Sequence, residues 1–155
     1  MAAITLPTAG LLNAGPGVLQ CAMLLIGGDD QGSAVDVEFD AQETLAVCNV
    51  PANCFIDHVS CVTETAWTTS VTLDLGDGDD ADGFLASAKV APTTAVSTGI
   101  LKSSVRATAE AYGVGKLYAV ADTLDVVIGG ATPAVGKTRI FIFYIPDYSA
   151  LPPVV

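Results

Sequence analysis

The sequence has few basic residues, few charges of either sign and no long apolar run. Only 6 of its 155 residues are Lys or Arg, against 17 Asp or Glu, which gives a formal net charge of −11 at pH 7. Phosphate backbones repel so acidic a chain, so we expect no nucleic-acid partner. Apolar runs such as Ala22–Ile26 fall far short of the roughly 20 residues of a spanning helix. No basic flank precedes the apolar N-terminal residues, so neither a membrane partner nor a secretory signal is expected.

Groups for catalysis are also scarce. His58 is the only histidine, and no G-x-S-x-G motif is present. Its neighbour Asp57 should point to the opposite face of a strand, away from the imidazole. The sequence therefore favours a protein that is not an enzyme and has no cofactor.

The four cysteines lack the tight C-x-x-C spacing that zinc sites use. They stand at Cys21, Cys48, Cys54 and Cys61. The pair Cys48 and Cys54 could in principle close a small loop, but we expect all four to be reduced and to act as small hydrophobic residues. No metal site is expected from them.

Two short motifs come close to known ligand sites. Gly136-Lys137-Thr138 ends like a phosphate-binding loop, but Ala131 stands where that motif needs glycine, and a strand-like segment follows instead of a helix. The acidic run Asp77–Asp82 fails the EF-hand spacing, because Lys89 falls where glutamate is required. We interpret the first as a turn between strands. For the second, a solvated acidic turn is favoured, and a cation site of another kind stays open.

The charge is unevenly distributed along the chain. Residues 1–88 carry 13 acids and no base, whereas residues 89–155 carry 4 acids and 6 bases, so their net charges are −13 and +2. The simplest interpretation is solubility; the alternative is a polarised molecule with an acidic side. Because 51% of the residues are apolar and only 15% are charged, a partner or further copies of the chain could also cover part of the surface.

Alternation of apolar and polar residues predicts strands, and Gly, Pro, Asn and Asp clusters separate them. Val18–Ile26 and Arg139–Ile145 are apolar on both faces, so they should be covered on both sides. Helix is expected only as short turns at Phe84–Ala88 and Ser103–Tyr112. The other expected strands are Val35–Phe39, Thr44–Val47, Phe55–Glu64, Ser70–Gly76, Leu117–Ala121 and Thr123–Gly129.

These elements predict an all-β protein with a single β-sandwich or jelly-roll-like domain. Residues 1–17 form an extended N-terminal arm in this prediction, residues 18–146 the sandwich, and residues 147–155 an extended C-terminal tail. For the aromatic residues, core packing is favoured over a sugar-stacking platform. They are Trp67, Phe141, Phe143, Tyr144 and Tyr148.

The order of features over residues 55–146 resembles the small β-sandwich virion proteins of tailed bacteriophages, of the capsid decoration or cement kind. The features are a Val/Thr-rich run, an aromatic residue in a Thr/Ser turn, an acidic Asp-Gly loop, an Asp-Thr-Leu-Asp-Val segment, a Gly-Gly-Ala-Thr loop and a strand ending in Tyr-Ile-Pro. In the sequence they are Val59–Glu64, Trp67, Leu75–Gly83, Asp122–Val126, Gly129–Lys137 and Tyr144–Pro146. No single motif among them is diagnostic, and residues 1–54 show no such likeness.

This resemblance implies a structural protein that binds the outside of a phage head and bridges major capsid subunits. It implies a homo-oligomer, with a trimer favoured, located on the virion surface after assembly in the host cytoplasm. A tail or fibre-associated protein and a carbohydrate-binding module are the alternatives. The residues expected at an interface are Ile4, Leu6, Leu11 and Leu12 from the arm, and Trp67 from the turn.

Overall fold

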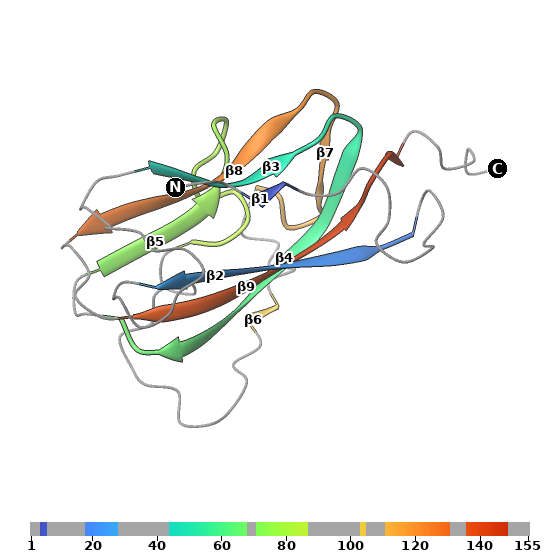
Figure 1. Ribbon diagram of the computed structural model, residues 1–155. Helices are drawn as coiled ribbons and strands as arrows, with labels where there is room; N and C mark the ends of the chain where they lie inside the picture. The colour runs from blue at the N-terminus through green and yellow to red at the C-terminus, as the bar shows by residue number, and fades with distance from the viewer. Residues whose placement is uncertain are drawn as a thin grey trace.

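The computed structural model describes residues 4–5, 18–27, 44–67, 71–86, 103–104, 111–130 and 136–148. In this part of the chain nine strands form two sheets, which Figure 1 shows as two layers. Sheet A has the order β1 (Ile4–Thr5), β3 (Thr44–Val50), β8 (Asp122–Gly130) and β5 (Val71–Gly76). Sheet B has the order β2 (Gln20–Gly27), β9 (Lys137–Ile145) and β4 (Cys54–Thr65), with β6 (Ser103–Ser104) and β7 (Lys116–Tyr118) both paired to β4. The prediction of an all-β sandwich is confirmed.

The strand pairs follow the course of one long antiparallel ribbon. Strand β2 pairs with β9, β3 with β8, and β4 with β7, so in each of these pairs an early strand runs antiparallel beside a late one. Successive pairs lie alternately in sheet B, sheet A and sheet B. A ribbon rolled up in this manner is a jelly roll, which closes two sheets over one core.

The core lies between the two sheets. It forms because buried and outward-facing residues alternate along each strand. In β9 every second residue is buried, from Thr138 to Tyr144, and the residues between them are half-buried. Strands β5 and β8 alternate in the same manner. Because successive side chains point to opposite faces, each strand gives one row of side chains to the core. The largest fully buried side chains include Tyr144, Ile26, Ile56, Leu73, Leu124, Ile128 and Ile140.

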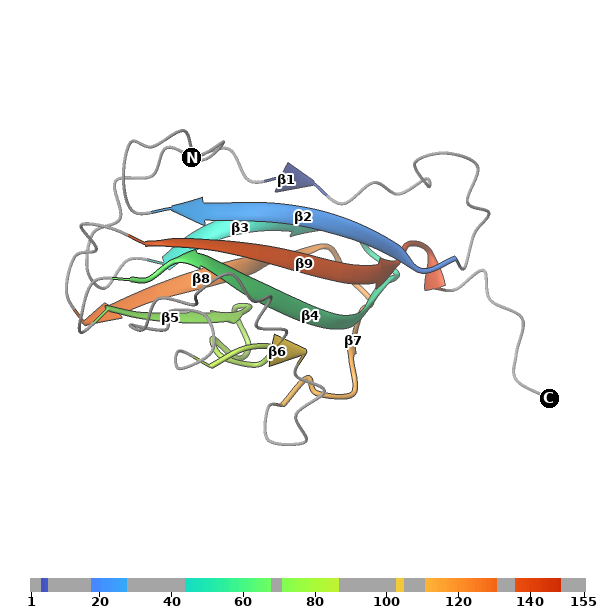
Figure 2. The same ribbon diagram turned by 90° about the horizontal axis from the view of Figure 1, so that it is seen from below.

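The prediction that β2 and β9 are covered on both sides is wrong for β2 and only partly right for β9. Met23 of β2 is 54% exposed, and Phe141 and Phe143 of β9 are half-buried. In Figure 2, β2, β9 and β4 lie towards the viewer, and no other described strand crosses in front of them. The physical reason is that the sandwich has two layers, so each sheet has a single core face.

The first predicted helical turn, Phe84–Ala88, is wrong over its described residues 84–86, and most of the second, Ser103–Tyr112, lies outside the described residues. Leu85 forms an isolated bridge with Leu75, and three backbone hydrogen bonds of 2.9–3.1 Å join Phe84 and Leu85 to Leu75. The first residues of the expected helical turn, Phe84 and Leu85, therefore pair with the edge of β5 instead of forming a helix. In the second segment, Ser103 and Ser104 form β6 against β4.

Other predictions fall outside the described residues. These are the strand at Val35–Phe39, the tail beyond residue 148, and the arm except for Ile4 and Thr5, which pair in parallel with Cys48 and Asn49 of β3. The described residues contain no helix long and apolar enough to span a membrane.

One end of the sandwich is closed by a tryptophan that packs on a glycine. Trp67 is 2% exposed, and its Nε1 donates a 2.7 Å hydrogen bond to Thr138 Oγ1. A Cβ placed on Gly136 would lie 2.2 Å from the Trp67 ring, and the φ of Gly136 is +146°. Glycine is thus needed at the start of β9 for backbone conformation and for space. The Gly136-Lys137-Thr138 motif thus lies at the start of β9, with Lys137 and Thr138 inside the strand, and not in a turn as the sequence predicted.

We predict that Gly136→Ala lowers the free energy of unfolding by more than about 1 kcal/mol, because the methyl group meets the indole and the backbone is strained. Gly78→Ala is the matched control, since a Cβ there has no atom within 4 Å and its φ lies outside the positive range. That control should change stability by no more than about 1 kcal/mol. Urea unfolding followed by Trp67 fluorescence measures both, and equal effects would contradict the packing role of Gly136.

Candidate interaction surface

The two sheets present outer faces of different chemistry. On sheet A, the outward side chains are mostly hydroxyl, amide and carboxylate groups. They are Thr44, Ala46, Asn49, Thr72, Asp74, Thr123, Asp125 and Val127. Apart from Ala46 and Val127, these residues are polar, and they make a polar and acidic face. One oxygen of this face, Asp125 Oδ1, is buried and has no hydrogen-bond partner among the described residues.

The outer face of sheet B is largely apolar and aromatic. The register places Met23 beside Phe141, and Cys21 beside Phe143, while Leu117 of β7 lies beside Phe55 of β4. We call these six residues the apolar face. Met23 is 54% exposed and Leu117 is 49% exposed, and the three phenylalanines are half-buried. An apolar area of this kind, opposite a polar one, is typical of a protein that binds a partner through one side.

His58 lies on this face and is held there by two contacts. Its ring stacks on Phe143 with centroids 4.3 Å apart and planes 13° apart, and its Nδ1 lies 2.6 Å from Asp57 Oδ2. The expectation that Asp57 points away from His58 is wrong, because a β-bulge between Ile56 and His58 breaks the alternation. The bonded and stacked imidazole extends the apolar face across β4.

The aromatic rings at the far end of this face pack on one another. Phe55 and Tyr148 have centroids 4.9 Å apart and planes tilted by 36°, and the Tyr148 N–H donates to the Asn53 carbonyl over 2.7 Å. A sugar-stacking platform would present coplanar rings side by side. These rings, like those of His58 and Phe143, instead cover each other, so the geometry favours packing as their role.

The opposite end of the face carries charge. Arg139 forms an ion pair with Glu64, and Lys137 lies 3.8 Å from the same carboxylate. Two bases against one acid make this end weakly basic, although the whole chain has a net charge of −11. Surface ion pairs of this kind contribute little to stability. We therefore expect these charged groups to favour solubility and to orient the molecule towards a partner.

The largest buried polar cluster surrounds Asp77, at the start of the acidic loop that follows β5. The Asp77 side chain has no exposed area. Its Oδ2 accepts hydrogen bonds of 2.6 Å from Lys116 Nζ and 2.6 Å from Tyr118 OH, and its Oδ1 accepts one of 3.0 Å from Tyr112 OH. The ammonium group also lies 4.3 Å from the Tyr112 ring centroid and 4.9 Å from that of Tyr118. The cluster joins the loop after β5 to the segment that leads into β7.

These contacts shift the ionisation of the cluster. Burial alone would raise the pKa of Asp77, but hydrogen bonds from Lys116, Tyr118, Tyr112 and the Asp80 N–H hold it below its ordinary value of 3.8. Burial would lower the pKa of Lys116, yet its bonds to the neighbouring oxygens raise it. Burial and the adjacent carboxylate raise the pKa of Tyr118. At neutral pH the cluster is therefore a carboxylate and an ammonium ion held between two neutral phenols.

This arrangement bears on the cation site left open for the acidic loop. A cation does lie against Asp77, and it is the Lys116 ammonium group at 2.6 Å. Within the described ranges, no group of three or more His, Cys, Asp or Glu side chains could hold a metal ion. The geometry supports a structural role for Asp77.

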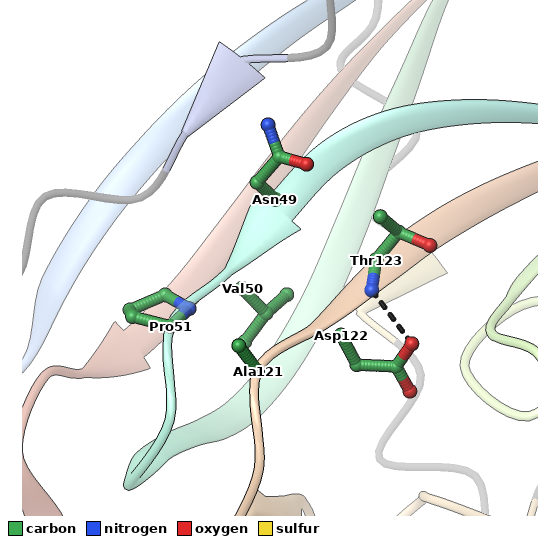
Figure 3. A pocket seen from close by; sticks show the side chains of 6 residues that line it. All are labelled: Asn49, Val50, Pro51, Ala121, Asp122 and Thr123. Atoms are coloured by element: carbon green, nitrogen blue, oxygen red, sulfur yellow. Dashed lines mark hydrogen bonds between the residues drawn. The ribbon is translucent and has the colours of Figure 1, made fainter.

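A shallow depression of about 390 Å³ lies where β3 ends and β8 begins. Its lining consists of Asn49, Val50, Pro51, Ala121, Asp122 and Thr123. Figure 3 shows the Asp122 carboxylate turned towards the backbone of Thr123, whose N–H donates to it over 2.8 Å. Besides this carboxylate, the polar groups of the lining are the Thr123 hydroxyl and the Asn49 amide.

The predicted interface residues are only partly placed by the structure. Ile4 belongs to β1 and pairs with Cys48, whereas Leu6, Leu11 and Leu12 lie outside the described residues. The Trp67 side chain is inside the core of this chain, where it bonds to Thr138. An interface role for these residues stays a prediction, and the apolar face was not singled out from the sequence.

The four cysteines, all of them among the described residues, form no disulfide, in agreement with the expected reduced state. Cys48, Cys54 and Cys61 are buried, and burial raises the pKa of Cys54 to about 12. They pack as small hydrophobic residues in the core. Cys21 differs, because it is exposed on the apolar face.

No protein-family model and no curated protein matches the sequence. Among solved structures, a chain of the cyanophage Pam1 capsid asymmetric unit is similar, with a TM-score of 0.57 and 15% identity over 88% of this chain and 91% of that one. A chain of the acidic stable capsid structure of Helicobacter pylori bacteriophage KHP30 has a TM-score of 0.45 and 12% identity, over 91% of this chain and 94% of that one. At such identities the first match shows a shared fold, the two-sheet sandwich described above.

We predict that Lys116→Met lowers the free energy of unfolding at pH 7 by about 3 kcal/mol, because it leaves the Asp77 carboxylate buried without its counter-charge. Lys137→Met is the control, since Lys137 lies 3.8 Å from its partner and is more exposed; it should cost less than about 1 kcal/mol. Chemical denaturation of both variants measures the difference. Similar losses would show that the Asp77 cluster adds no more than a surface pair.

We also predict an acid-sensitive contribution from Asp77. Because its folded pKa lies below 3.8, its stabilisation is present above that pH and is lost as the pH falls through the folded value. In the variant Asp77→Asn the side chain at this position has no ionisable group. The difference in unfolding free energy between wild type and this variant should therefore narrow below about pH 4. Unfolding measured from pH 7 to pH 2 tests this, and a difference that stays constant would contradict it.

Proposed function

We propose that the protein is a structural component of a phage virion that binds the outer surface of the head and bridges neighbouring major capsid subunits. The observation that carries the proposal is the fold match to a chain of a phage capsid asymmetric unit, which covers 88% of this chain and 91% of that one. The matched chain is therefore of similar length, and the fold match extends over most of both chains. Jelly rolls are a recurrent fold of viral capsid domains.

The unequal outer faces of the sandwich support the same proposal. A protein attached to a shell needs one adhesive side and one side that stays solvated. The apolar face, with Leu117 and Met23 about half exposed, suits the first purpose, and the polar face of sheet A, on which Thr44 and Asn49 are exposed, suits the second. Since a shell repeats its subunits, many modest contacts of this kind sum to a strong attachment.

The proposed mechanism makes and breaks no covalent bond. The rigid sandwich spans the junction between two shell subunits, and the apolar face loses water on contact. A homo-oligomer would raise the number of contacts per particle, and the trimer favoured from the sequence is part of this proposal. The two cations at one end of the face, Lys137 and Arg139, would orient the molecule against acidic groups of the shell.

Binding to heads tests the proposal. Heads of the phage that encodes this chain, assembled without it, should co-sediment with the purified wild type and reach a saturating, stoichiometric ratio. Heads from an unrelated phage are the control for non-specific adsorption. If the wild type never binds its own heads, or adsorbs equally to both, the proposed function is wrong.

A pair of surface variants tests the binding mode. We predict that Leu117→Glu on the apolar face weakens head binding roughly tenfold or more, because it places a charge in a contact that must lose water. Thr44→Glu, an exposed strand position on sheet A, is the matched control and should bind as the wild type does. If Thr44→Glu loses head binding and Leu117→Glu retains it, the contact with the shell lies on sheet A. Thermal unfolding of both variants confirms that the fold is retained.

A further inference from the structure

The edges of the two sheets differ in how well the chain itself covers them. At one edge of sheet A, β1 pairs with β3 at Cys48 and Asn49. At the other edge, Leu75 of β5 exchanges backbone hydrogen bonds with Leu85. In sheet B, the outer side of β4 is paired by β6 and β7. Each of these three edges therefore has partners from its own chain.

Strand β2 is the fourth edge, and it has no such cover within the described residues. It is the end strand of sheet B, and among the described strands it pairs only with β9. Figure 2 shows β2 on the outer side of β9. All eight residues from Gln20 to Gly27 pair in continuous register, without the bulges seen between β3 and β8 or between β4 and β9. An edge strand that is long and regular presents a row of backbone N–H and C=O groups to another chain.

The side chains of β2 also lack the features that protect edges. The strand QCAMLLIG contains no charged residue and no proline. Exposed apolar side chains gather at it: Met23 is 54% exposed, and Val18 and Leu19, just before it, are 46% and 49% exposed. Charged residues, proline and bulges are the usual devices that prevent edge-to-edge association, and none is present here.

We propose that β2 pairs with β2 of a second copy, antiparallel across a two-fold axis, so that two copies of sheet B form one continuous sheet. Identical uncharged strands can pair in this manner without any charge mismatch, and the contact is self-complementary by symmetry. The two apolar faces then join into one wider surface on the same side. This contact rests on the edge of sheet B alone and holds whether or not the protein binds a phage head.

The symmetry of the contact selects the antiparallel orientation. A two-fold axis perpendicular to the sheet relates β2 to an identical strand that runs in the opposite direction, so Gln20 of each copy lies towards Gly27 of the other. The strand carries no charged residue along this contact, so no like charges are brought together.

Sedimentation of matched variants tests the contact. Wild type should sediment as a dimer, or as a hexamer if the trimer of the proposed function also forms through another surface; a trimer alone would contradict the two-fold contact. Met23→Lys should weaken self-association roughly tenfold or more, because two lysines then lie near the two-fold axis. Met23→Leu should retain the self-association, because it conserves the size and apolar character of the side chain. Val120→Lys should retain it as well, because Val120 is 77% exposed in the turn after β7, on the opposite side of sheet B from β2. A monomer, or an oligomer whose mass is insensitive to Met23→Lys, overturns the proposal.

Amide hydrogen exchange then distinguishes strand pairing from side-chain contact. In an antiparallel sheet, every second N–H of β2 points away from β9. Those amides should exchange slowly in concentrated wild type, and become fast on dilution or in Met23→Lys, while the amides that bond to β9 stay protected in both. If the outward amides exchange fast in the intact oligomer, the copies associate elsewhere and the proposal is overturned. Because no phage heads are present, these results are independent of the head-binding experiment.

Discussion

The structure depends on the burial of one face of each sheet against the other. Removing apolar area from water is the main favourable contribution to folding, and here it requires every strand to place alternate residues in the same layer. Strand β9 shows the consequence most clearly, with Ile140, Ile142 and Tyr144 buried and the residues between them turned outwards. The same alternation that builds the core thus determines which residues reach the outer faces, and so determines the interaction surface.

Much of the fold could be predicted from the sequence, because period-two patterns and turn residues are local signals. Strands β5 and β8 lie where Val71, Leu73 and Leu75, and Leu124, Val126 and Ile128, alternate with polar residues. Apolar runs were less informative. The sequence of β9 is apolar on both faces, which is equally consistent with a strand buried on both sides and with one whose second face binds a partner.

The candidate site was harder to predict, since it depends on contacts between distant residues. Asp77 and Lys116 are 39 positions apart, and no spacing rule connects an acidic loop with that lysine. The β-bulge that brings Asp57 to His58 has no clear sequence signature. The environment of Trp67 was misleading, because a polar stretch surrounds a side chain that is buried. The apolar face is visible only once the register places Cys21 and His58 on either side of Phe143.

The position of β9 has a consequence for biosynthesis. It is the last described strand, yet it lies in the middle of sheet B, between β2 and β4. While a ribosome is still producing the chain, β2 and β4 therefore have no common neighbour to align on, and sheet B can close only after β9 has been synthesised. Until then no described strand pairs with β2 on either side, so nascent copies on neighbouring ribosomes of one messenger have both sides of this strand through which the proposed contact can form.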